Sequence, residues 1–105
     1  MSGGVKHDEG KPILSLISSD ALEELAKVLS FGAKKYEDHN WRKGFKWSRI
    51  YDAAQRHLIK YNRGERIDPE TGLSHLSHAF CNLMFLIEFE KNNVGEDDLW
   101  KGYKK

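Results

Sequence analysis

Residues 68–82 decide how this chain folds, and they read Asp-Pro-Glu-Thr-Gly-Leu-Ser-His-Leu-Ser-His-Ala-Phe-Cys-Asn. The segment ends a loop and begins an apolar helix, which places His75, His78 and Asn82 at offsets of three and seven. At about 3.6 residues per turn these side chains share one stripe, and Phe85 and Phe89 continue that stripe toward packed structure. Polar groups that face an interior need partners. The sequence leaves three kinds of partner open: other protein groups, a metal or a bound ligand.

Apolar periodicity on both sides of this segment predicts an all-α fold. Ser18 and Ser19 precede the first amphipathic pattern, and Ser48 is placed to cap the second. Gly64 follows the second pattern and is expected to end it. The chain shows no strand alternation, internal repeat or low-complexity segment. We therefore predict a small bundle of three main helices, joined by long functional loops, at about residues 18–36, 48–63 and 75–91.

Each predicted helix has a set of apolar residues on one face, which we expect to be buried. For the first helix these are Leu22, Leu25, Ala26, Leu29 and Ala33. For the second they are Ile50, Ala54, Leu58 and Tyr61, and for the third they are Leu76, Ala79, Leu83, Leu86 and Ile87.

The two ends of the chain are predicted to lie outside the bundle. Residues 1–11 are rich in glycine and charge, which favours a flexible N-terminal arm. Residues 12–17 are mainly apolar and are expected to pack as an extended lead-in. Residues 92–105 form a polar C-terminal tail, with Trp100 and Tyr103 as expected docking points.

Composition restricts the class of protein and of partner. Residues 1–105 are enough for one domain, and its modest apolar surface must serve both a core and a ligand, so we expect a homo-oligomer. The net charge of +1 argues against binding of bulk nucleic acid. The lone cysteine, Cys81, excludes an internal disulfide and favours a reducing setting. Without an apolar run of roughly 18 residues or a signal peptide, the chain is expected to be cytoplasmic and off the membrane.

Positive side chains follow one face of the second helix. Arg49 is followed at offsets of seven, eleven and fourteen by Arg56, Lys60 and Arg63. Guanidinium groups bind phosphate oxygens in bidentate fashion, so the stripe suits a polyphosphate, although a solvated helix face is the alternative. With the preceding loop and the N-terminal segment, the candidate phosphate ligands are Lys11, Arg42, Lys43, Arg49 and Arg56.

Aromatic residues accompany these cations. Trp41 and Trp47 flank the positive loop, and Tyr36 precedes it. A nucleotide needs an aromatic face for its base beside charge for its phosphates. We therefore add Tyr36, Trp41 and Trp47, together with Asn82 from the polar stripe, to the candidate nucleotide-binding residues. The alternative is that both indoles only cover the small core or an oligomer contact.

Histidines from two predicted helices can come together. His57 lies at the edge of the apolar face of the second helix, and an antiparallel third helix would bring His75 and His78 near it. With Asp68 or Glu70, such a cluster suits zinc, manganese or another transition metal. A hydrogen-bonded polar pocket explains the histidines equally well.

Five segments in order form a recognisable set: Lys6–Pro12, Phe31–Tyr36, Asn40–Gly44, Arg56–Leu58 and Asp68–Ala79. Together they resemble a small phage and prophage family, the dATP/dGTP diphosphohydrolase N-terminal domain, over about residues 6–90. The resemblance implies an all-α nucleotide pyrophosphohydrolase, distantly similar to MazG-like enzymes. Those enzymes hydrolyse a nucleoside triphosphate to the monophosphate and pyrophosphate with a divalent metal. The third motif also adds Asn40 to the candidate nucleotide-binding residues.

Two functional hypotheses follow. In the first, the chain is a phage-type enzyme of the host cytoplasm that hydrolyses purine (deoxy)nucleoside triphosphates with Mg or Mn. Its candidate catalytic residues are Asp68, His57, His75 and His78, and its candidate metal ligands are Glu37, Asp38 and Asp68. In the second, no cofactor is required, and the chain is an anti-defence protein that captures a nucleotide immune signal of the host without turnover.

One departure from the MazG-like pattern separates these hypotheses. MazG-like enzymes hold metal with clustered Glu and Asp on two helices, whereas the third helix here offers His75, His78 and Asn82 at the comparable place. Magnesium prefers oxygen ligands, so the departure keeps the capture hypothesis open. A purely structural helical protein is a third alternative, but it does not explain the aligned polar residues.

Overall fold

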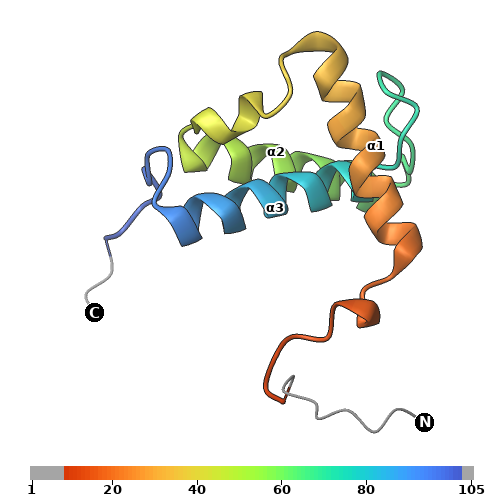
Figure 1. The fold of residues 1–105 in the computed structure, drawn as a ribbon. Coiled ribbons are helices and arrows are strands. Elements are labelled where there is room, and N and C mark those ends of the chain that lie inside the picture. Colours follow the sequence, from red (N-terminus) through yellow and green to blue (C-terminus); the bar gives the residue numbers. More distant parts are fainter. Residues whose placement is uncertain (1–8, 103–105) are drawn as a thin grey trace, which may run out of the picture.

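The computed structural model describes residues 9–102, in which three α-helices form a small bundle (Figure 1). Within this range, β-structure is limited to two isolated bridges. The all-α prediction is therefore confirmed. The helices are α1 (Ser19–Lys35), α2 (Trp47–Asn62) and α3 (His75–Asn92), with the short 3-10 helices η1 (Leu14–Leu16) and η2 (Asn40–Lys43).

The helix α3 is the element on which the other two pack. α2 and α3 lie side by side and run in opposite directions, whereas α1 crosses the pair near the beginning of α3 (Figure 1). The link between α1 and α2, residues 36–46, contains η2 and returns the chain along the pair. The space between α1 and α2 is therefore backed by α3.

Side-chain caps fix two of the helix starts. The Ser18 hydroxyl accepts a hydrogen bond from the backbone N–H of Ala21, and the Ser74 hydroxyl accepts one from that of Leu76. The prediction that Ser48 caps α2 is wrong, because α2 begins at Trp47. Instead, the backbone N–H and the hydroxyl of Ser48 both donate to the Asp98 carboxylate, at 2.8 and 2.6 Å.

The buried surface of the helices differs from the predicted apolar faces. In α1 no residue is fully buried, and Leu22, Ala26 and Ala33 are exposed. In α2 the prediction holds for Ile50 and Ala54. The buried residues of α3 are His75, Ser77, Ala79, Cys81 and Phe89, whereas Leu76, Leu83 and Ile87 are exposed. Because α3 is apolar on nearly every side, its pattern could not show which side its neighbours would cover.

The lead-in before α1 also departs from its prediction. Residues 12–17 are exposed and include the 3-10 turn η1, so they do not pack as an extended segment. Most of the predicted N-terminal arm lies outside the described residues. Its described part, residues 9–11, forms an exposed turn.

The segment after α3 packs against the start of α2. The backbone N–H of Trp47 donates to the Glu96 carbonyl at 2.9 Å, and its indole N–H donates to the Val94 carbonyl at 2.8 Å. Trp100 is largely exposed, and Tyr103 lies outside the described residues. In the part of the chain that the structure describes, no helix has the length and apolar character needed to span a membrane.

Candidate functional site

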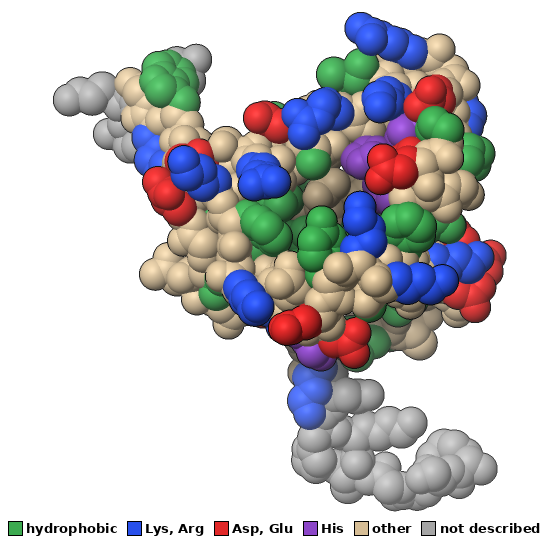
Figure 2. All heavy atoms as spheres, turned by 90° about the horizontal axis from the view of Figure 1, so that it is seen from above, with side chains coloured by type: hydrophobic (Ala, Val, Ile, Leu, Met, Phe, Trp, Pro, Cys, Tyr) green, Lys and Arg blue, Asp and Glu red, His purple; other side chains and the backbone are tan. Residues whose placement is uncertain are grey.

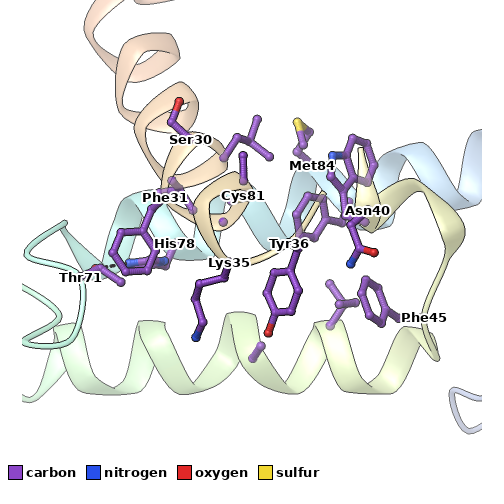
Figure 3. Close-up of a pocket in the computed structure, with 18 of the residues that line it drawn as sticks. Ser30, Phe31, Lys35, Tyr36, Asn40, Phe45, Thr71, His78, Cys81 and Met84 are labelled. Carbon is purple, nitrogen blue, oxygen red and sulfur yellow. Dashed lines mark hydrogen bonds between the residues drawn. The ribbon is translucent and has the colours of Figure 1, made fainter. Parts of the chain in front are cut away.

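A cavity of about 1100 Å³ lies between α1 and α2, with α3 behind it (Figure 3). Thr71 and His78 are at one end of it, and Asn40 and Phe45 are at the other (Figure 3). The two ends differ in chemistry, and we name each by its residues. The histidine end consists of His57, Asp68, Thr71 and His78, and the aromatic end consists of Trp41, Phe45 and Phe85.

The loop between α2 and α3 holds two side chains at the histidine end. It closes on itself because the backbone N–H of Asp68 donates to the Leu73 carbonyl, and that of Gly72 donates to the Asp68 carbonyl, each at 2.8 Å. The Asp68 carboxylate accepts the Glu70 backbone N–H at 2.9 Å. The Thr71 hydroxyl accepts the Leu73 backbone N–H at 3.2 Å. These local bonds position Asp68 and Thr71 without a ligand.

A chain of hydrogen bonds supports His57 from outside the cavity. His57 Nδ1 lies 2.8 Å from Nδ1 of His75, and His75 Nε2 lies 2.7 Å from Oε2 of Glu65. The His75 side chain has no exposed surface, whereas that of Glu65 is 47% exposed. His57 lines the cavity, but His75 and Glu65 do not. His75 therefore supports the cavity wall by its hydrogen bond to His57.

His78 occupies the same end from the side of α3. Its Nε2 lies 2.7 Å from the Thr71 hydroxyl and 3.7 Å from Oδ2 of Asp68. Its ring is nearly parallel to that of His57, with the centroids 4.7 Å apart. The prediction that His57, His75 and His78 come together is therefore confirmed, because the three rings form one cluster.

Burial makes the cavity-lining histidines poor bases. Burial lowers the pKa of His57 to about 4, and the neighbouring rings of His78 and His75 also lower it. Burial also lowers the pKa of His78, although the Asp68 carboxylate partly opposes this effect. Both rings are therefore neutral at pH 7. A neutral imidazole offers one donor and one acceptor.

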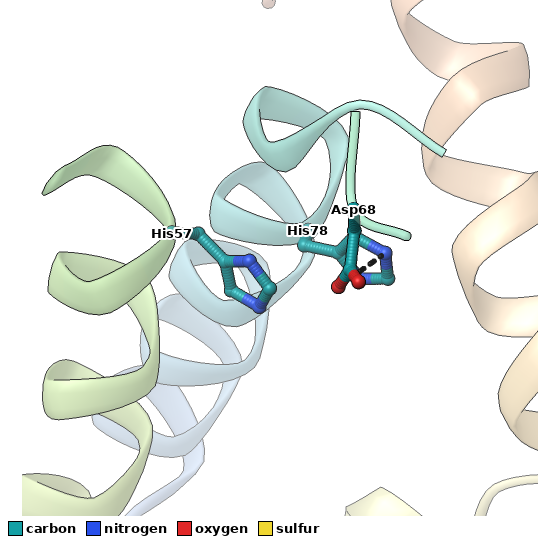
Figure 4. Close-up of side chains that lie close together, drawn as sticks. All are labelled: His57, Asp68 and His78. Atoms are coloured by element: carbon teal, nitrogen blue, oxygen red, sulfur yellow. Dashed lines mark ion pairs between the residues drawn. The ribbon is translucent and has the colours of Figure 1, made fainter. Parts of the chain in front are cut away.

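The histidine end is also the candidate metal site of the described residues. His57, Asp68 and His78 each offer a ligand atom, and these atoms lie within 4.8 Å of one another (Figure 4). Two nitrogens and one oxygen suit a transition metal better than Mg²⁺. Ligation would require one ring to turn, because near-parallel imidazoles do not direct their lone pairs at a common point. Of the predicted metal ligands, Glu37 and Asp38 line the cavity but do not join this group.

Positive side chains border the hollow in which the histidines are visible (Figure 2). Arg49, Arg56 and Lys60 of the predicted stripe line the cavity, whereas Arg63 does not. Arg42 lines it as well, and its Nη1 lies 3.6 Å from the carboxylate of Glu88. The stripe is therefore divided between the cavity wall and the outer surface.

The aromatic end is packed against itself. The Trp41 ring stacks on Phe85 with a centroid distance of 4.7 Å, and the Arg42 guanidinium lies 4.5 Å from the centroid of the Trp41 ring. Trp41 thus has partners within the chain on a surface that a base would use. Tyr36, which also lines the cavity, is 59% exposed and more accessible.

Several predicted binding residues lie elsewhere. Lys11 is exposed before α1, Lys43 pairs with the Glu37 carboxylate at 3.7 Å, and Asn82 donates to the His78 carbonyl of its own helix. Trp47 holds the segment after α3 through its indole N–H. The structure therefore does not place Lys11, Lys43, Trp47 or Asn82 in the cavity lining.

Two site residues were missed by the sequence reasoning. Glu65 binds His75, and Thr71 binds His78. Thr71 lies within the quoted motif, between Pro69 and the helix start, where a hydroxyl often turns back onto the backbone. For Glu65 no sequence signal distinguishes it from other surface acids.

Comparisons with known proteins point in one direction. A family model described as dATP/dGTP diphosphohydrolase, N-terminal, matches residues 1–99. A Salmonella phage PMBT28 protein named "dATP/dGTP diphosphohydrolase" is 42% identical over 95 residues. That match covers 90% of this chain but 32% of the phage protein, so the chain spans about a third of the length of that relative. No solved structure matches the chain.

Proposed function

We propose, from the premise that this chain belongs to the dATP/dGTP diphosphohydrolase N-terminal family, that its cavity binds a purine nucleoside polyphosphate. The observation that carries the proposal is the lining of one cavity by cations of α2 and by the polar groups of the histidine end. Its volume of about 1100 Å³ is at the upper end of the roughly 300–1,000 Å³ usual for small-molecule sites.

The cations of α2 are the proposed phosphate ligands. Arg49 and Arg56 are both exposed, line the cavity and form no ion pair with a described residue. Guanidinium groups that are exposed and not already paired with a carboxylate can bind phosphate oxygens through charge-assisted hydrogen bonds. Arg42 is the weaker candidate, because its guanidinium already pairs with the Glu88 carboxylate.

Hydrolysis is the first candidate fate of the bound nucleotide. It is supported by the name of the phage relative and by the acid and imidazoles at the histidine end. Water would attack the α-phosphorus of a deoxynucleoside triphosphate, and pyrophosphate would leave. We propose a divalent metal for this reaction, and the two nitrogen donors favour Mn²⁺ over Mg²⁺. Asp68, His57 and His78 are the proposed catalytic residues, with His75 supporting His57.

Capture without turnover is the second candidate. It is supported by the single carboxylate, that of Asp68, in the group that could hold metal among residues 9–102. The oxygen-rich ligand set that Mg²⁺ prefers is not formed there. In that case the cavity would hold a nucleotide signal of the host intact, as an anti-defence protein of the cytoplasm would require.

One experiment separates the two fates. The protein is incubated with a panel of nucleotides and cyclic nucleotides, with Mg²⁺ or Mn²⁺, and the products are resolved by chromatography. Appearance of monophosphate and pyrophosphate supports hydrolysis. A nucleotide that disappears from solution and returns intact after heat denaturation supports capture. If no nucleotide is bound or changed, the proposed function is wrong.

We further propose that the chain assembles as a homo-oligomer. Leu76, Phe80, Leu83 and Ile87 recur at helical spacing on α3, and each is 37–61% exposed. A row of exposed apolar side chains is typical of a protein contact. Sedimentation of the parent and of Leu83→Glu tests this: the variant should be smaller, and a monomeric parent at micromolar concentration contradicts the proposal.

A further inference from the structure

The end of α1 carries two lysines that differ in what they face. Lys34 and Lys35 both fall in the last turn of α1, where the partial negative charge of the helix end favours positive side chains. Lys35 lines the cavity, whereas Lys34 does not. The Lys35 side chain extends from α1 into the space in front of α2 (Figure 3). The two lysines therefore share a helix end, but only Lys35 is placed to reach a ligand of the cavity.

The ammonium group of Lys35 is not held by an acid. Lys35 is exposed and forms no ion pair with a described residue. Glu37, an acid two residues further along the chain, pairs with Lys43 instead, at 3.7 Å. The Lys35 ammonium lies 5.9 Å from the centroid of the Tyr36 ring, at the outer limit of a cation–π contact. Such a lysine suits the role of a phosphate ligand.

Cations of α2 face Lys35 from the opposite wall of the cavity. Arg49 and Arg56 line that wall without an ion pair to a described residue, and Lys60 lines it as well. Like charges on two walls repel each other, and a polyanion between them attracts both. Because α1 has no fully buried residue, its position should respond to such a ligand more than that of α2 or α3.

Tyr36 adds an accessible ring to the α1 wall. It directly follows Lys35, lines the cavity and is 59% exposed. Its ring stacks on no aromatic ring of a described residue, whereas the Trp41 ring lies on Phe85. Along the cavity, Lys35 lies between Tyr36 and His78 (Figure 3). The phosphates of a nucleotide whose base lies on Tyr36 would therefore pass Lys35 on the way to the histidine end.

We propose that the end of α1 is the second wall of the nucleotide site, in which Tyr36 stacks on the base and Lys35 binds the phosphates across from the cations of α2. The polyphosphate extends from Lys35 toward the histidine end, where the proposed metal ligands lie. The bound nucleotide thus bridges α1 and α2. This inference rests on the proposed function, to which it adds the orientation of the nucleotide and a phosphate ligand on α1.

The two roles are tested by calorimetry with dATP and inorganic tripolyphosphate, without metal so that no turnover occurs. Lys35→Met removes the charge and keeps the length of the side chain, and it should weaken binding of both probes about tenfold. Tyr36→Leu should weaken binding of dATP about tenfold and leave that of tripolyphosphate unchanged. Lys34→Met, the matched change outside the cavity lining, should alter neither affinity by more than about twofold.

Three results of this titration would overturn the inference. They are equal effects of Lys35→Met and Lys34→Met, equal effects of Tyr36→Leu on the two probes, and a parent that binds dATP but not tripolyphosphate. A parent that binds neither probe contradicts the proposed function and the inference with it. Circular dichroism of each variant checks that the helices are retained.

The bridge between the helices is tested by amide hydrogen exchange, read by mass spectrometry, with and without saturating tripolyphosphate. In the parent, the probe should slow exchange in both Ser19–Lys35 and Trp47–Asn62. In Lys35→Met, at a saturating concentration, it should slow exchange only in Trp47–Asn62. Slower exchange confined to Trp47–Asn62 in the parent would mean that α2 alone holds the phosphates, and it would overturn the role of Lys35.

Discussion

The two ends of the cavity use similar ring side chains in different ways. At the histidine end, His57 bonds through its outer nitrogen to His75 and keeps the other nitrogen for the cavity. At the aromatic end, Trp41 uses its ring face on Phe85 and on Arg42. The His57 ring is held through Nδ1, so its other nitrogen stays available to a ligand. The ring face of Trp41 is already in contact with other side chains, so it is not available to a base. The difference teaches that a candidate binding residue is better judged by which of its polar atoms or ring faces have no partner within the chain than by its residue type.

The largest expected effect concerns the support behind the histidine end. His75→Ala should lower the free energy of unfolding by about 3 kcal/mol, because it leaves a cavity and removes the hydrogen-bond partner of His57 Nδ1. Urea denaturation measures this. Leu22→Ala, at a 45% exposed position of α1, should cost under about 1 kcal/mol. Similar losses for the two variants would show that the histidine network contributes little to stability.

The next effect concerns the cations between the two ends. Arg56→Ala should weaken nucleotide binding by about 2 kcal/mol, since a charge-assisted contact to phosphate is lost. Arg63→Ala removes the same kind of side chain from the C-cap of α2, outside the cavity lining, and should change the affinity less than about twofold. Calorimetric titration of both variants decides between a phosphate site and a solvated stripe, which would give equal effects.

A smaller effect is expected at the aromatic end. Trp41→Phe keeps a ring against Phe85, so binding should weaken by less than about 1 kcal/mol. Fluorescence or calorimetric titration checks this, with circular dichroism as the control for folding. A loss of more than tenfold would show that the Trp41 indole contacts the ligand directly, and the contrast between the two ends would then be lost.

The smallest effect is expected for the amide of the α3 stripe. Asn82→Ala removes a bond to the His78 carbonyl of the same helix and no cavity contact. Stability should change by about 0.5 kcal/mol or less, and nucleotide affinity should not change measurably. If Asn82→Ala abolished binding, the cavity would have to extend along α3 beyond the residues that line it here.

Sequence by itself determined the features that depend on neighbours along the chain. The three helices and the single polar and aromatic stripe of α3 follow from the helical repeat, because residues three and four apart must share a face. The stripe consists of His75, His78, Asn82, Phe85 and Phe89. The capping role of Ser18 is likewise local. The predicted meeting of His57 with His75 and His78 needed only the antiparallel order of two successive helices.

Tertiary structure alone decided which of several equivalent surfaces would be used. Apolar residues surround α3, so the burial of Ala79 and the exposure of Leu83 depend on where α1 and α2 approach it. The role of Glu65 depends on the path of a loop that brings a surface carboxylate to a buried ring, and nothing in its local sequence marks it. Periodicity fixes directions within one helix, but the distance between two helices is set by packing of side chains from both, and that information is not local to either segment.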